Sequence, residues 1–188
     1  ENLKNYFYVF APEYYLWPLE IHIINYLIHY AENDLNKENA ESISELYTSN
    51  NKGLVIFSPD FIEQYKQACL KECMKYVGKP KKEVINELLK YYKTWDNYSL
   101  SILYLRIYEY FFPVGFHKNK LLINFSQLLL LNINPNPNKR LTINETIKRF
   151  TELFYMDGSV DNYIEILLQM DYDKDITTKK IKEDILNL

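Results

Sequence analysis

Several residues in this 188-residue sequence have types and spacings that could do chemistry. Asp171, Asp173 and Asp175 alternate along the chain in the way that opens a calcium-binding loop. Such a loop also needs glycine at its sixth position and glutamate at its twelfth, where this chain has Ile176 and Lys182. We therefore interpret the acidic run as a solvated linker and not as a calcium site.

Two cysteines and two histidines are the other candidate ligands. Cys69 and Cys73 lie one helical turn apart, but zinc takes four ligands and no second pair has a suitable spacing. His22 and His29 are seven residues apart, too far to share an ion with two ligands only. We predict packed positions for the cysteines, core or interface positions for the histidines, and no metal site.

The sequence lacks the common catalytic and nucleotide-binding motifs. Neither G-x-S-x-G nor H-E-x-x-H occurs, and only 4 glycines are available for a phosphate-binding loop. Tyrosine and phenylalanine are frequent between residues 91 and 112, but stacking on bases needs a basic groove and the net charge is −3. We therefore predict no catalytic residue and no cofactor in this chain, no nucleic-acid partner, and core packing for these aromatic residues.

The periodicity and capping residues predict an all-α fold in a single helical domain, residues 1–188. Ser58-Pro59-Asp60 is typical of a helix start, Gly78 of a helix end, and Thr142 with Glu145 of a capping box. Residues 5–10 are expected to be extended, and residues 33–52 to form a surface excursion with one helical turn. Helices are expected at 19–30, 59–77, 80–92, 97–112, 126–133, 143–154, 159–170 and 178–188.

The composition places the protein in a broad class. It is 47% hydrophobic and 25% charged, which is typical of a globular protein. No segment has the roughly 20 apolar residues that span a membrane, and the first residues do not read as a signal peptide. We expect a reducing, cytoplasmic location and no membrane partner. The 18 tyrosines and frequent Asn, Lys and Ile indicate an A/T-rich genome, such as that of a parasite or a large DNA virus.

Three short motifs stand out by their order. They are Ala11-Pro12-Glu13, then Asp96-Asn97-Tyr98-Ser99-Leu100-Ser101-Ile102, then Asn136-Pro137-Asn138-Lys139-Arg140-Leu141-Thr142. The second begins the most hydrophobic predicted helix, and the third adjoins the capping box. In this order they resemble the A-P-E, D-x-W/Y-S-L-G and D-P-x-x-R-x-T motifs of the C-terminal lobe of eukaryotic-type protein kinases. Ser101 stands where the family has glycine.

The resemblance implies scaffold roles for three residues. It implies an ion pair between Glu13 and Arg140, and that Asp96 accepts backbone N–H bonds from the catalytic loop. The family's Gly-rich loop, strand lysine, H-R-D and D-F-G precede A-P-E, and none occurs in this chain. Residues from about 19 to 92 would then be a helical insertion that reshapes the substrate-binding face.

We carry two main hypotheses. In the first, the chain, which starts at Glu1 without Met, is a piece of a serine/threonine kinase-like protein, such as that of a large DNA virus. It would scaffold the active site and substrate docking, while the remainder of that chain would bind ATP and Mg²⁺. In the second, it is a non-catalytic structural or adaptor protein of the host cytoplasm or the virion, pseudokinase-like, with a protein partner at its Tyr-rich N-terminus. An unrelated helical protein with chance motifs is a third, weaker reading.

Overall fold

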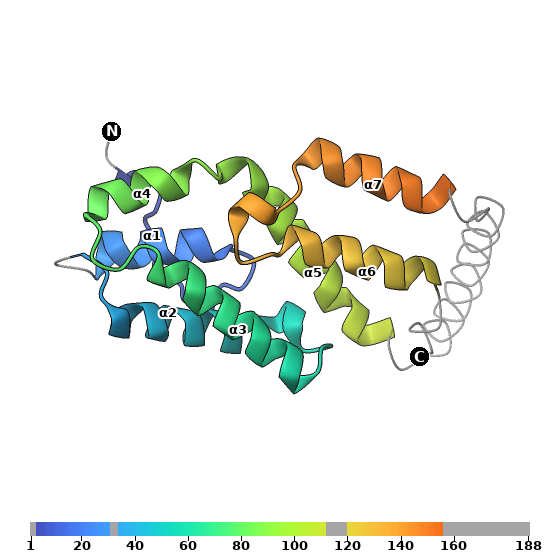
Figure 1. Ribbon diagram of the computed structural model, residues 1–188, viewed down its shortest axis with the longest axis horizontal. Coiled ribbons are helices and arrows are strands. Elements are labelled where there is room, and N and C mark those ends of the chain that lie inside the picture. The colour runs from blue at the N-terminus through green and yellow to red at the C-terminus, as the bar shows by residue number, and fades with distance from the viewer. Residues whose placement is uncertain (1–2, 31–33, 112–119, 156–188) are drawn as a thin grey trace, which may run out of the picture. The chain divides into compact units, whose positions relative to one another are not determined.

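The computed structural model describes residues 3–30, 34–111 and 120–155, and every regular element in these ranges is helical (Figure 1). This confirms the predicted all-α class. The chain divides into two compact units, residues 1–147 and 148–188. The helices predicted at 159–170 and 178–188, and the run Asp171 to Asp175, lie outside the described residues. The α-helices are α1 (Leu19–His29), α2 (Lys37–Ser49), α3 (Pro59–Met74), α4 (Lys81–Leu89), α5 (Trp95–Phe111), α6 (Lys120–Asn132) and α7 (Ile143–Tyr155).

Local sequence determines where several helices begin and end. Ser58 caps α3, since its Oγ accepts a hydrogen bond from the Phe61 N–H at 3.3 Å. At its other end, α3 ends at Met74, three residues before the predicted end at residue 77, and Gly78 has a φ of 72° in the turn that follows. Thr142 and Glu145 form the predicted box, because each backbone N–H donates to the other residue's side chain, at 2.8 and 3.3 Å.

A 13-residue helix, α2, replaces the surface excursion expected at residues 33–52. Asn36 and Asn39 form a reciprocal capping box at its start. Its buried apolar positions, Ala40, Ile43 and Tyr47, have helical spacing but stand among polar residues. Because residues 33–52 contain so few apolar side chains, their composition is typical of a loop. They form a helix because α2 packs on α3.

Two other secondary-structure predictions differ from the structure. Residues 5–10 are not a strand: Leu3–Asn5 is a 3-10 turn, η1, and the Tyr6 and Phe7 N–H groups both donate to the Leu3 carbonyl. Helix α6 begins at Lys120 instead of Ser126.

The core of residues 1–147 forms where the helices meet. α1 contacts α2 and α4, and α5 contacts α6 and two 3-10 turns, η2 (Lys52–Leu54) and η3 (Tyr92–Thr94). Gly53 of η2 lies so close to α5 that an added Cβ would meet Ile102 Cγ2 at 3.0 Å. The fully buried large side chains include Leu19, Ile23, Leu27, Tyr47, Leu54, Leu88, Tyr98, Ile102, Leu105 and Ile133.

Candidate functional site

A buried ion pair lies at the centre of the candidate site. Arg140 directly follows a 3-10 turn, η6 (Pro137–Lys139), and its Nη1 and Nη2 donate to the two carboxylate oxygens of Glu20 at 2.8 and 2.9 Å. Its Nε donates to the Asn134 carbonyl at 2.7 Å. The side chains are 0% and 2% exposed. Burial alone would lower the pKa of Arg140, but the Glu20 carboxylate raises it, so the arginine is charged.

The resemblance had implied Glu13 as the partner of Arg140, and here the structure differs. Glu13 is exposed in the segment before α1, whereas Glu20 is the second residue of α1. The first turn of a helix favours a carboxylate, and the burial of α1 carries this one into the core. The apolar character of residues 19–30, which predicts a buried helix, was the sequence feature that could have favoured Glu20.

Asp96 lies in the first turn of α5 and is exposed. It makes no hydrogen bond to any residue that the structure describes, and the catalytic loop that the resemblance assigned to it is not in this chain. The next residue, Asn97, is buried and was missed by sequence reasoning. Its Nδ2 donates to the Leu141 carbonyl at 3.3 Å and to Thr146 Oγ1 at 2.8 Å, which joins α5 to the segment after Arg140.

Two further contacts join the second motif to the segment before α1 and to Arg140. Ser99 Oγ donates to the Leu16 carbonyl at 2.7 Å, which joins α5 to the segment before α1. The Arg140 guanidinium carbon lies 5.1 Å from the centre of the Tyr98 ring, within the range of a cation–π interaction. The second and third motifs are therefore in direct contact, and both also contact residues 16–20, which follow the first motif, Ala11-Pro12-Glu13, but do not belong to it.

Buried tyrosines surround this ion pair. The Tyr98 hydroxyl bonds the Tyr47 hydroxyl and accepts from Asn51 Nδ2 at 3.2 Å, and the Tyr65 hydroxyl donates to the Ile133 carbonyl at 2.8 Å. Burial raises the pKa of Tyr47, Tyr65 and Tyr98. These hydroxyls stay neutral and act as hydrogen-bonding core residues, not as proton-transfer groups.

The cysteines occupy the packed positions that were predicted. Both are free thiols with no exposed surface, and Ser44 Oγ lies 3.6 Å from Cys73 Sγ. Burial raises the pKa of Cys69, and that of Cys73 to about 12, so neither is a thiolate nucleophile. Within the described ranges, no three His, Cys, Asp or Glu side chains are placed to hold a metal ion.

The histidines lie in different environments. His22 is buried with its ring 5.2 Å from that of Tyr47 and 6.1 Å from that of Trp17. His29 is exposed, and its Nε2 lies 2.6 Å from the Phe7 carbonyl oxygen. His22 is thus a core residue, as one of the predicted alternatives had it.

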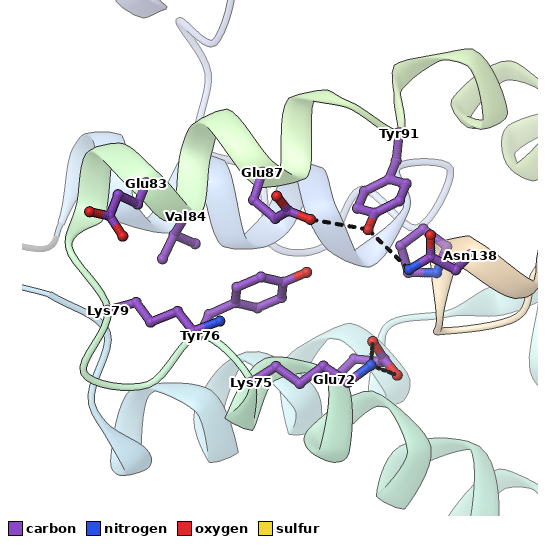
Figure 2. A pocket seen from close by; sticks show the side chains of 10 residues that line it. Glu72, Lys75, Tyr76, Lys79, Glu83, Val84, Glu87, Tyr91 and Asn138 are labelled. Carbon is purple, nitrogen blue, oxygen red and sulfur yellow. Dashed lines mark hydrogen bonds and ion pairs between the residues drawn. The ribbon is translucent and has the colours of Figure 1, made fainter.

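A pocket of about 280 Å³ opens between α3, α4 and η6 (Figure 2). Tyr76, just after α3, reaches into it, and Figure 2 shows its hydroxyl facing the space between Glu87, Tyr91 and Asn138. Tyr91 donates to Glu87 at 3.3 Å and accepts from Asn138 Nδ2 at 3.0 Å. The remaining lining residues are Glu72, Lys75, Lys79, Glu83, Val84 and Pro137.

Comparison of the chain with protein-family models, curated proteins and solved structures found no match. Among the helices that the structure describes, none combines the length and the apolar character needed to cross a bilayer.

Proposed function

We propose that this chain forms the helical scaffold lobe of a serine/threonine kinase-like protein and is not itself catalytic. The observation that carries the proposal is the contact between the second and third motif segments around Arg140. Asn97 Nδ2 donates to the Leu141 carbonyl, 44 residues along the chain, and the Arg140 guanidinium lies over the Tyr98 ring. Residues Leu16 and Glu20, which follow the first motif, join this cluster through Ser99 and Arg140.

The ion pair is not the one that the resemblance implies, since Arg140 pairs with Glu20 and not with Glu13. It is nevertheless bidentate and buried, and it holds the third motif segment against α1. Because the pair is buried, loss of one partner would leave an uncompensated charge in the core. Such a pair therefore locks the Asn136–Thr142 turn onto α1.

The chain's part in such a protein is to brace the active site. Asp96 presents an exposed carboxylate at the start of α5, where it is free to accept N–H groups from a loop supplied by the rest of the kinase-like chain. ATP and Mg²⁺ would bind to that remainder, since the lysine, H-R-D and D-F-G groups that hold them do not occur here.

Mg-ATP binding tests this proposal. The complete protein encoded by the gene and the 188-residue chain would each be titrated with Mg-ATP and followed by thermal shift and by phosphotransfer to a serine peptide. We expect binding by the complete protein, its loss in a complete protein carrying Arg140→Ala and Glu20→Ala, and no binding by the 188-residue chain. A complete protein that is folded but neither binds Mg-ATP nor carries H-R-D and D-F-G would refute an active kinase.

A non-catalytic adaptor is the second candidate, and the exposed aromatic side chains favour it. Tyr6 and Tyr8 are 70% and 75% exposed, and Tyr14 and Tyr30 are also exposed. Aromatic residues of this kind are enriched in protein interfaces. Under this alternative, replacing Tyr6 and Tyr8 by serine would abolish capture of a protein partner and leave the thermal stability of the chain unchanged.

A further inference from the structure

A second, mainly apolar groove lies between η1 and α4, on a different face of α4 from the pocket in Figure 2. The described residues that line it are Leu3 of η1 and Lys81, Lys82, Ile85, Asn86 and Leu89 of α4. Its volume of about 490 Å³ lies within the roughly 300–1,000 Å³ of most small-molecule sites. The groove is therefore large enough for a small ligand.

The apolar part of the lining has the length of a short alkyl chain. Ile85 and Leu89 lie one helical turn apart on the same face of α4, and Leu3 adds to this surface from η1. Ile85 is 5% exposed, and Leu3 and Leu89 are half-buried. From Lys81 to Leu89 the helix rises by about 12 Å. An extended chain of about eight to ten carbons covers the same distance.

The charged side chains of the lining are positive and lie at one end of the groove. They are Lys81 and Lys82 in the first turn of α4, and no carboxylate of the described residues contributes to the lining. Glu83, the acidic residue of the same turn, lines the separate pocket of Figure 2 instead. Lys82 is exposed and forms no ion pair with any residue that the structure describes. This end of the groove therefore favours an anionic group.

The stability of α4 does not explain these two lysines. The start of a helix carries partial positive charge, so its first turn favours acidic residues over basic ones. Asp34 offsets part of the charge, since its Oδ1 accepts a hydrogen bond from the Lys81 backbone N–H at 2.7 Å. Lys82 has no such counter-ion among the described residues. An apolar groove with an ammonium group at one end is complementary to a ligand with an anionic head and an apolar chain.

We propose that this groove binds a free medium-chain carboxylate. Lys82 contacts the carboxylate, and the alkyl chain lies along Ile85, Leu89 and Leu3. The residues involved all belong to residues 1–147, and none of them belongs to the three kinase-like motifs. The groove has the same chemistry whether or not the chain is part of a kinase-like protein.

Titration of the isotope-labelled 188-residue chain with sodium octanoate, followed by NMR, tests the proposal. We expect saturable shifts in the amides of α4 and Leu3, with a Kd on the order of 1 mM for so small a ligand. Octylammonium has the same chain with the opposite charge, and acetate has the head group without the chain. Each should bind at least about 5-fold more weakly, because one of the two kinds of contact is lost.

Three variants assign the contacts. Lys82→Glu reverses the charge at the groove and places an acidic residue where the helix favours one, so α4 stays folded. We expect at least about 10-fold weaker octanoate binding, with unchanged or higher thermal stability. Asn86→Trp fills the groove from an exposed lining position and should weaken octanoate and octylammonium alike. Lys37→Glu, the same change in the first turn of α2, is the matched control and should bind octanoate as the unaltered chain does.

Several results would overturn the assignment. They are an absence of saturable shifts in α4 up to about 20 mM octanoate, equal binding of octylammonium, or unchanged octanoate binding by Lys82→Glu. Sedimentation of the chain with phosphatidylglycerol vesicles, without binding of free octanoate, would assign the lysines to a membrane surface and contradict a site for a free carboxylate. If Asn86→Trp did not fold, the comparison of Lys82→Glu with Lys37→Glu would still decide the question.

Discussion

At the scale of single residues, the Arg140–Glu20 pair has the largest expected effect on stability. Replacing either residue by alanine leaves the other charge buried without its partner, which typically costs ~3–5 kcal/mol. We expect Arg140→Ala and Glu20→Ala each to lower the free energy of unfolding by about this amount in urea denaturation. The double variant should lose much less than the sum, because the two residues interact directly.

Glu13→Ala is the matched control for this cycle. Glu13 is exposed, so we expect its replacement to change the free energy of unfolding little. In the double variant, this change should simply add to that of Arg140→Ala. Coupling of Arg140 to Glu13 and not to Glu20 would contradict the structure and restore the pairing that the kinase resemblance implied.

His22 makes stability depend on pH. Burial lowers its pKa from 6.5 to about 4, against a smaller opposing effect of hydrogen bonds to the Tyr14 and Trp17 backbone. Above pH 6.5 the imidazole is neutral in both states. As the pH falls from 6.5 towards 4 the unfolded chain binds a proton that the folded chain does not, so stability is lost, to a total of about 3 kcal/mol.

The comparison of two glutamine variants measures this effect. His22→Gln cannot titrate, and its free energy of unfolding should fall by about 3 kcal/mol less between pH 7 and pH 4 than that of the unaltered chain. His29→Gln, at an exposed position, should keep the pH dependence. If the free energy of unfolding changed equally with pH in the unaltered chain and in His22→Gln, His22 would not be buried in its neutral form.

At the scale of elements, two glycines are required for different reasons. Gly53 allows η2 to approach α5, since an added Cβ would lie 3.0 Å from Ile102 Cγ2 and 3.1 Å from the Ile102 carbonyl oxygen. We expect Gly53→Ala to cost ~1–3 kcal/mol through overpacking. Gly78 has open space around its Cβ position but a φ of 72°, so Gly78→Ala should cost ~1–2 kcal/mol through backbone strain.

Substitution by asparagine distinguishes backbone strain at Gly78 from overpacking at Gly53. It tolerates the left-handed conformation better than alanine does, so Gly78→Asn should recover part of the stability lost in Gly78→Ala. At Gly53 the larger side chain should instead be worse than alanine. Urea denaturation of the four variants shows whether the alanine or the asparagine variant is more stable at each position. If Gly53→Asn were more stable than Gly53→Ala, η2 would not be closely packed on α5.

At the scale of the whole molecule, the buried cysteines report on opening of the core. Cys69 and Cys73 have no exposed surface and raised pKa values, so a thiol reagent can reach them only when the surrounding helices separate. We expect labelling to be slow in the folded protein and to accelerate with urea in parallel with unfolding.

A cysteine placed on the surface provides the control for this labelling. Ser42 is exposed on α2, so Ser42→Cys should react at once in the folded protein while the other two thiols stay protected. Rapid reaction of Cys69 or Cys73 without denaturant would show that α2 and α3 separate locally, and that the core does not open as a unit.

The sequence by itself determined the all-α class and those boundaries that rest on local hydrogen bonds. The Ser58 cap and the Thr142–Glu145 box each involve residues three positions apart, so their hydrogen bonds can be predicted from the sequence. The tertiary structure decided what depends on distant segments. Helix α2 is stabilised by contact with α3, and Arg140 pairs with Glu20 because the burial of α1 directs that carboxylate inward while Glu13 stays in solvent. The pocket at Tyr76 likewise brings residues 72–91 beside residues 137 and 138, a proximity that no spacing along the chain encodes.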